Sequence, residues 1–212
     1  MFKQGSLILF LLTMLFIPSA FGQTAQDIGS SLFYEPISAM KVSPFVYCCL
    51  PKKGPIKDMP TVIERFIQTT KTQDIIPESL LFGILYDVPD QRGDEQLEWE
   101  VGFLLGKQYH PKAPLMKKQW GYKLVISALH IGPYAETGKT IAKMLEWMDT
   151  RGYIPVGPVL ERYLELNPLS EMKIDELKMK IEIWIPYKKR EEIDLKHRDW
   201  SSPPTLGMAD AG

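Results

Sequence analysis

Four residues in the second half of the sequence have the types and spacing of a small-molecule site. Glu161 and Tyr163 are two positions apart in the segment VLERYLEL, and Glu182 and Trp184 are two apart in KMKIEIWI. Both segments read as strands, in which side chains two positions apart share a face. A carboxylate beside aromatic rings suits an organic cation through Coulomb attraction, cation–π contact and stacking. A desolvated Glu161 would have a raised pKa, so it is the general-base candidate if the protein is an enzyme.

How these four residues group depends on which way the two strands face. The last strand also carries an apolar row, Leu177, Met179, Ile181, Ile183 and Ile185. If this row packs under helices, the opposite face of the sheet would present all four candidate residues together. The alternative is an ordinary polar sheet face with solvated ion pairs. In that case Glu165 would lie beside Arg162, and Glu182 near Lys178 and Lys180.

The other reactive residue types do not form a recognisable site. The three histidines, His110, His130 and His197, lie far apart in the sequence and lack the spacing of metal ligands. Cys48 and Cys49 are adjacent on a predicted strand, so their thiols would point to opposite faces. We interpret them as two small buried hydrophobic residues and His130 as a structural residue. We therefore expect no metal site and no cofactor.

The candidate residues lie in the second of two similar halves. Each half reads as strand, helix, strand and strand, over 45–54, 59–67, 80–88 and 97–106 and then over 122–132, 141–148, 159–167 and 177–186. In each half the first strand ends in Gly-Pro, at Gly54-Pro55 and Gly132-Pro133. Two βαββ units predict an α+β domain with pseudo-two-fold symmetry, in which the helices cover one side of an antiparallel sheet. The other side would then line a central ligand cleft.

The two ends of the sequence differ from this middle part. Residues 1–22 contain a lysine, a short apolar run and then small residues, which is the order of a secretory signal peptide. We expect cleavage after Gly22, export to the periplasm or the exterior, and no stable membrane span afterwards. An uncleaved N-terminal anchor is the alternative. Residues 23–44 are predicted as an N-terminal extension, 45–187 as the domain and 188–212 as a flexible tail.

The charge balance bears on the class of partner. The chain has 25 Lys and Arg residues against 26 Asp and Glu, a formal net charge of -1 at pH 7. Domains that bind phosphate backbones normally have a clear basic excess, so we expect no nucleic-acid partner. The oligomeric state stays open.

The sequence resembles the GyrI-like small-molecule-binding domain, most closely in its second half. The resemblance covers roughly 45–187 and rests on four motifs in order: Gly132-Pro133-Tyr134, Glu161-Arg162-Tyr163, Asn167-Pro168 and Glu182-Ile183-Trp184-Ile185-Pro186. The family also supplies the effector-binding parts of bacterial multidrug-responsive regulators. It implies the same pair of βαββ units and a cleft with a central acidic residue, which often receives cationic aromatic compounds. By motif match that residue is Glu161, with Tyr163 beside it.

We therefore predict an exported protein that binds an amphipathic or cationic organic ligand in a cleft centred on a glutamate. The predicted ligand-binding residues are Glu161, Tyr163, Glu182, Trp184 and Tyr134. One alternative is a hydrolase of reactive small molecules that uses Glu161 as general base. Another is a protein-interaction module that uses an exposed strand edge.

Overall fold

The computed structural model describes residues 36–86, 96–170 and 178–191. The predicted signal peptide and most of the predicted tail, residues 192–212, lie outside the described residues. The strands and helices are β1 (Ser38–Lys41), β2 (Phe45–Lys53), η1 (Ile56–Asp58), α1 (Met59–Thr72), β3 (Phe82–Leu85), β4 (Glu98–Leu104), β5 (Met116–Trp120), β6 (Leu124–Gly132), η4 (Tyr134–Glu136), α2 (Thr137–Thr150), β7 (Tyr153–Pro155), β8 (Val159–Tyr163) and β9 (Met179–Lys189).

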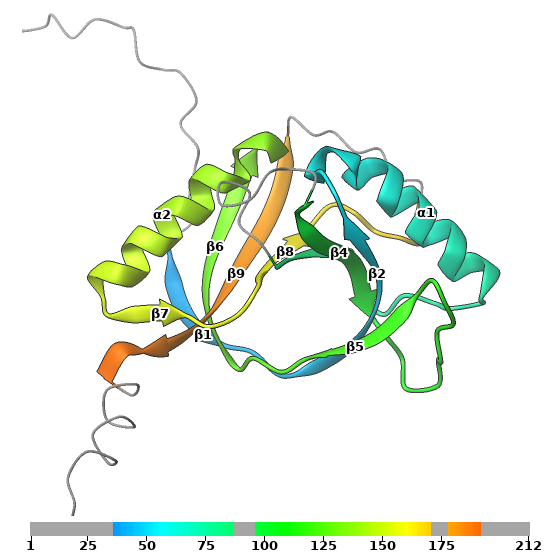
Figure 1. Cartoon of the computed structure of the whole chain (residues 1–212), viewed down its shortest axis with the longest axis horizontal. Helices are drawn as coiled ribbons and strands as arrows, with labels where there is room; N and C mark the ends of the chain where they lie inside the picture. The colour runs from blue at the N-terminus through cyan, green and yellow to red at the C-terminus, as the bar shows by residue number, and fades with distance from the viewer. Residues whose placement is uncertain (1–35, 87–95, 171–177, 192–212) are drawn as a thin grey trace, which may run out of the picture. The chain divides into compact units, whose positions relative to one another are not determined.

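The predicted repeat of two βαββ units is confirmed (Figure 1). The first unit is β2, α1, β3 and β4, and the second is β6, α2, β8 and β9, with the short β7 added. Both units turn from the first strand into the helix in the same way. Gly54 has a φ of 128° and Gly132 a φ of 146°, which only glycine adopts without strain. Each glycine precedes a proline and a single 3-10 turn, η1 or η4.

Both helices pack on one face of the sheet because each has an apolar stripe. The stripes consist of Met59, Val62, Ile63, Phe66, Ile67 and Thr70 in α1 and of Thr137, Thr140, Ile141, Met144 and Met148 in α2. They share one core with the inward side chains of β2, β4, β8 and β9. That core includes Met179, Ile181, Ile183 and Ile185 of the predicted apolar row, and Leu177 lies outside the described residues. No helix in the described ranges is long and apolar enough to cross a membrane.

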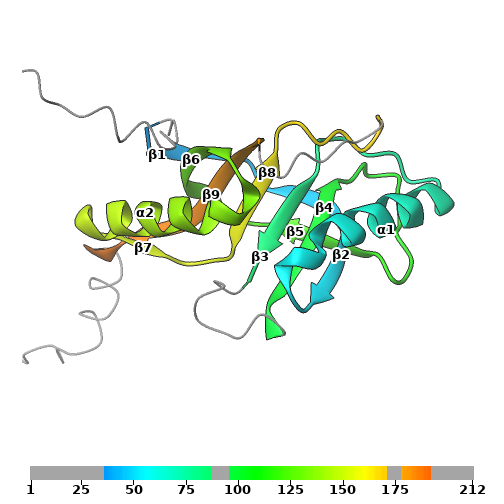
Figure 2. The same cartoon turned by 90° about the horizontal axis from the view of Figure 1, so that it is seen from above.

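The sheet is antiparallel and runs in the order β1-β6-β9-β8-β3-β4-β2-β5, with β7 paired to β9 (Figure 2). The two units meet where β3 pairs with β8, so the pseudo-two-fold relation passes between these strands. At the centre of this pairing Gly83 lies opposite Glu161. The topology thus brings Glu161 to the junction of the two units.

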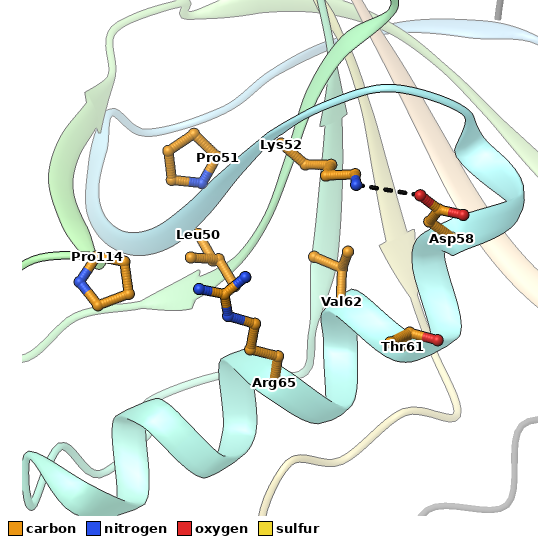
Figure 3. A pocket seen from close by; sticks show the side chains of 8 residues that line it. All are labelled: Leu50, Pro51, Lys52, Asp58, Thr61, Val62, Arg65 and Pro114. Carbon is orange, nitrogen blue, oxygen red and sulfur yellow. Dashed lines mark ion pairs between the residues drawn. The ribbon is translucent and has the colours of Figure 1, made fainter. Parts of the chain in front are cut away.

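A long ribbon, which the sequence analysis did not predict, joins the two edges of the sheet. β1 pairs with β6, and β2 pairs with β5, in one continuous register from Ser38↔Ser127 to Cys49↔Met116. The backbone N–H of Val42 donates to the carbonyl of Lys123 at 2.9 Å, which links the two pairings. β1 lies in the predicted N-terminal extension. Beyond Cys49, β5 no longer pairs with β2, and a hollow lies there beside α1 (Figure 3).

The face of the sheet opposite the helices carries a second hydrophobic core. It consists of Tyr47, Cys49, Phe82, Ile84, Trp120, Val125, Leu160 and Trp184. Phe45 stacks on Trp120 with ring centroids 6.1 Å apart and meets Phe82 edge to face. The expectation that this face is free to line a cleft was wrong, because aromatic residues from the joining ribbon cover it. Cys48 and Cys49 lie in opposite cores as free, buried thiols, which confirms their interpretation.

Candidate functional site

Glu161 is completely buried at the centre of the molecule. Its relative exposure is 0%, and it lies on the helix-covered face of β8. Its Oε2 accepts hydrogen bonds from the hydroxyl of Tyr134 at 3.0 Å and from that of Tyr163 at 3.3 Å. Its Oε1 has no hydrogen-bond partner among the described residues. A buried carboxylate oxygen without a partner costs free energy, and such an atom in a native fold calls for an explanation.

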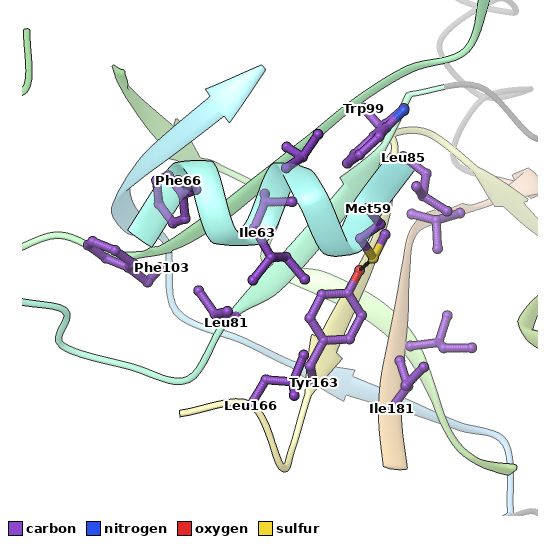
Figure 4. Close-up of a cluster of buried hydrophobic side chains, with 14 of the residues drawn as sticks. Met59, Ile63, Phe66, Leu81, Leu85, Trp99, Phe103, Tyr163, Leu166 and Ile181 are labelled. Atoms are coloured by element: carbon purple, nitrogen blue, oxygen red, sulfur yellow. Dashed lines mark hydrogen bonds between the residues drawn. The ribbon is translucent and has the colours of Figure 1, made fainter. Parts of the chain in front are cut away.

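The residues around Glu161 come from both units. Tyr134 lies in η4, directly before α2, and Met59 is the first residue of α1. The Tyr163 hydroxyl is 3.1 Å from the Met59 sulfur, as Figure 4 shows. The rings of Tyr134 and Tyr163 meet edge to face with centroids 6.3 Å apart. We call Glu161, Tyr134, Tyr163 and Met59 the glutamate cluster.

Burial controls the protonation of this cluster. It raises the pKa of Glu161 from 4.5 to about 7, and the nearby hydroxyl groups of Tyr134, Tyr163 and Thr137 oppose this rise only in part. Burial and the neighbouring Glu161 charge raise the pKa values of Tyr134 and Tyr163 well above 10, so both hydroxyls keep their protons. Near neutral pH the carboxyl group is therefore divided between its charged and neutral forms.

The sequence analysis missed two residues of this arrangement, Met59 and Gly83. A Cβ atom at Gly83 would lie 2.4 Å from the Tyr163 hydroxyl oxygen, so the hydroxyl occupies the space that any larger residue would fill. A lone glycine in a short apolar strand indicates a close approach of another group. That signal does not identify the approaching atom, because the pairing of β3 with β8 spans 78 residues.

We expect Gly83→Ala to destabilise the fold by about 1–3 kcal/mol, because the new methyl group overpacks the Tyr163 hydroxyl. Urea unfolding measures the change. The double variant Gly83→Ala/Tyr163→Phe should recover part of the loss, since the next atom of Tyr163 is 3.3 Å away. Gly138→Ala is the matched control, because its Cβ would have no neighbour within 4 Å and should not destabilise. Equal losses in the two single variants would contradict the role of Gly83.

Glu182 and Trp184 lie on the opposite face of the sheet from the glutamate cluster. In the pairing of β8 with β9, Glu161 lies opposite Ile183, and Leu160 opposite Trp184. Residues paired across adjacent strands share a face. The expectation that all four candidates share one face was therefore wrong. Glu161 and Tyr163 accompany the apolar row of β9 instead of facing away from it.

Glu182 is neutralised where it lies. Arg162 forms an ion pair with it, and the Ser127 hydroxyl donates to its other oxygen at 3.3 Å. The Arg162 guanidinium also lies over the Trp184 ring, 5.0 Å from its centroid. Glu165 pairs with Lys180 at 3.0 Å, not with Arg162. The sequence-based alternative predicted such ion pairs, but it placed Glu165 beside Arg162 and Glu182 near the lysines. In the structure Glu182 pairs with Arg162, and Glu165 pairs with Lys180.

A second buried carboxylate, Glu100, was not singled out by its sequence. Its relative exposure is 0%, and it accepts hydrogen bonds from Tyr47 at 2.7 Å, Tyr86 at 2.9 Å and Lys118 at 2.5 Å. These partners come from separate strands and loops, so no local motif indicates them. Both carboxylate oxygens have donors, which distinguishes Glu100 from Glu161.

His130 is a structural residue, as interpreted from the sequence. It is completely buried, with Nδ1 2.8 Å from the Thr140 hydroxyl and Nε2 3.0 Å from the Pro133 carbonyl. Burial lowers its pKa, so it holds the turn before α2 as a neutral ring.

The central cleft is closed in this conformation. Two hollows, of about 500 and 260 Å³, lie along β2, and Glu161 lines neither of them. Glu161 itself has no exposed surface. Three of the five predicted ligand-binding residues, Glu161, Tyr163 and Tyr134, are brought together, and Glu182 and Trp184 are not.

Comparisons with solved structures show a shared fold. The crystal structure of the EcmrR C-terminal domain aligns with a TM-score of 0.63 at 13% identity, over 74% of this chain and 99% of that domain. EcmrR in its DNA complex aligns with the same score and identity, and there the alignment covers 58% of the longer chain. An uncharacterized conserved protein from Listeria innocua aligns with a TM-score of 0.51 at 15% identity, over 72% of this chain and 92% of that one.

A comparison with curated protein sequences finds no match. The family model of the GyrI-like small molecule binding domain matches residues 37–188, which is more than half of the chain and includes all of the glutamate cluster. The fold, the repeat of two βαββ units and this match agree. The chain belongs to the GyrI-like small-molecule-binding domain family.

Proposed function

We propose that the protein binds an organic cation with aromatic or apolar surface at the glutamate cluster. The observation that carries this proposal is the buried Oε1 of Glu161, which has no hydrogen-bond partner among the described residues. A ligand cation beside Oε1 would supply the missing interaction in a site of low dielectric, where a charge pair is strong. Membership of a small-molecule-binding family supports the binding of a small molecule by this chain.

The neighbours of Glu161 suit such a ligand. Tyr134 and Tyr163 offer aromatic rings, whose faces attract cations, and Met59 offers a flexible and polarizable thioether. Met and aromatic side chains can repack around ligands of different shape. The cluster is therefore suited to ligands that share a positive charge and apolar surface but differ in shape.

Binding requires the cluster to open, because Glu161 is completely buried. Tyr134 is the candidate gate, since it is only partly buried and lies in the short turn η4 between β6 and α2. If it swings outward, Oε2 loses one hydrogen bond and the carboxylate becomes accessible. A ligand cation beside the carboxylate then offsets the loss of that hydrogen bond, so opening and binding are coupled.

The N-terminal sequence supports a location outside the cytoplasm, in the periplasm or the exterior. In that location the protein would meet external organic cations directly. Export is a separate part of this proposal and does not depend on the identity of the ligand.

Calorimetric titration of the full-length protein at pH 8 with tetraphenylphosphonium tests the binding proposal. Neutral triphenylphosphine oxide is the matched probe, because it has a similar aromatic body and no net charge. We expect saturable binding of the cation and at least about tenfold weaker binding of the neutral probe. Equal affinities, or no saturation by the cation up to about 1 mM, would refute the proposal.

A further inference from the structure

A hollow of about 500 Å³ lies between α1 and β2, away from the glutamate cluster (Figure 3). It is lined by Leu50, Pro51, Lys52, Asp58, Thr61, Val62, Arg65 and Pro114. Leu50 and Val62 are buried and form an apolar floor, with relative exposures of 5% and 8%. Its volume is in the range of about 300–1,000 Å³ that is typical of small-molecule sites.

The hollow exists because β5 ends before β2 does. The last residue of β2 that pairs with β5 is Cys49. The backbone N–H of Gly54 donates to the Leu97 carbonyl at the end of β4. In an antiparallel pair, alternate residues of a strand direct their backbone groups toward the partner strand and away from it. Pro51, three positions before Gly54, therefore directs its backbone groups away from β4 and toward the hollow. Proline has no N–H to offer a further strand. The open edge is therefore poorly suited to an added peptide strand, which favours a small molecule as occupant.

The charge of the hollow is positive. Lys52 and Asp58 form an ion pair at 3.1 Å and offset each other. Arg65 projects from α1 toward Leu50 in Figure 3 and has no ion-pair or side-chain hydrogen-bond partner among the described residues. The lining thus has two cationic side chains against one anionic side chain, a net charge of +1. The excess charge is a guanidinium next to an apolar floor.

We propose that this hollow binds a small organic anion, with its carboxylate on Arg65 and its apolar body on Leu50 and Val62. A guanidinium presents parallel N–H donors that match a carboxylate, and it is weakly hydrated compared with an ammonium group. Pro51 and Pro114 provide rigid apolar walls for the body of the ligand. The hollow is separate from the glutamate cluster and selects the opposite charge, so it does not depend on the function proposed for Glu161.

Titration of the full-length protein with 4-phenylbutyrate, and with the neutral 4-phenylbutyramide as matched probe, tests this proposal. We expect saturable binding of the carboxylate and about tenfold weaker binding of the amide. Arg65→Gln should lower the affinity for 4-phenylbutyrate about tenfold and leave that for the amide unchanged. Lys71→Gln is the control, because Lys71 is an exposed residue of the same helix that does not line the hollow. This variant loses the same charge and should change neither affinity.

Thr61→Trp tests the location independently, because the larger side chain at the rim should fill the hollow and weaken both probes. Equal losses from Arg65→Gln and Lys71→Gln would overturn the proposal, as would undiminished binding in Thr61→Trp. Glu161→Gln should leave 4-phenylbutyrate binding unchanged. Failure of the anion site and failure of the cation site are therefore separate results.

Discussion

Glu161→Gln is expected to lower the affinity for tetraphenylphosphonium about 100-fold while the fold is retained. The substitution keeps the size of the side chain and removes the charge. Loss of one partner from a desolvated charge pair costs about 2–5 kcal/mol, and about 2.7 kcal/mol corresponds to a factor of 100. The new amide N–H₂ group would also face the ligand cation with its positive end. Calorimetric titration at pH 8 measures the loss.

Glu165→Gln is the matched control for this change. Glu165 lies two positions after Tyr163, is exposed, and forms an ion pair with Lys180 on the surface. It carries the same charge as Glu161 but lies outside the buried cluster, so its substitution should change the affinity by less than about twofold. A loss of equal size in both variants would mean that the ligand responds to general charge and not to Glu161.

Glu161→Gln is also expected to stabilise the protein at alkaline pH, by up to about 3 kcal/mol. The pKa of Glu161 is about 7 in the folded protein and 4.5 as an ordinary value. The folded state therefore binds the proton more tightly than the unfolded state. The stabilising contribution of the protonated carboxyl is complete below pH 4.5 and is lost as the pH rises through 7. A rise of 2.5 in pKa corresponds to about 3 kcal/mol.

Urea unfolding of both proteins at pH 4.5, 6 and 8 measures this difference. The glutamine side chain does not titrate, so the variant does not lose stability as the pH rises through 7. Other titrating groups contribute equally to the stabilities of both proteins. We expect similar stabilities at pH 4.5 and a more stable variant at pH 8. A difference independent of pH, or a less stable variant at pH 8, would show that the buried, ionised Glu161 does not destabilise the folded protein. A substitution that stabilises the fold and removes ligand binding is typical of a functional site.

Much of the architecture could be predicted from the sequence because its signals are local. The Gly-Pro pairs at Gly54 and Gly132 mark the same turn in both units. The apolar spacing of α1 and the alternation of β4 and β9 follow from periods of 3.6 and 2 residues. These features depend on neighbours along the chain, so one sequence contains them.

The composition of the site was predicted only in part, because it depends on strand register. Alternation along β8 shows that Glu161 and Tyr163 share a face, but not which face of the neighbouring β9 that is. A shift of one residue in the pairing exchanges the two faces. The same limit applies to Gly83 and Met59, which reach the cluster through pairing and packing across 78 and 104 residues.

The covered second face has a different cause. It depends on β5 and β1, two strands with weak local patterns, which pair across the sheet edges and carry Trp120 into the aromatic core. In β5 the residues MKKQW show no apolar alternation. No local rule distinguishes such a segment from a loop. The sequence therefore predicted that this face of the sheet is free, whereas an aromatic core covers it.

A crystal structure of the full-length protein with tetraphenylphosphonium tests the central proposal most directly. We predict that the phosphorus atom lies within about 6 Å of the Glu161 carboxylate, with Tyr134 displaced from its hydrogen bond to Oε2. The Tyr163 ring and the Met59 side chain should contact the phenyl groups of the ligand. A ligand bound elsewhere, with the Tyr134–Glu161 hydrogen bond intact at 3.0 Å, would contradict it.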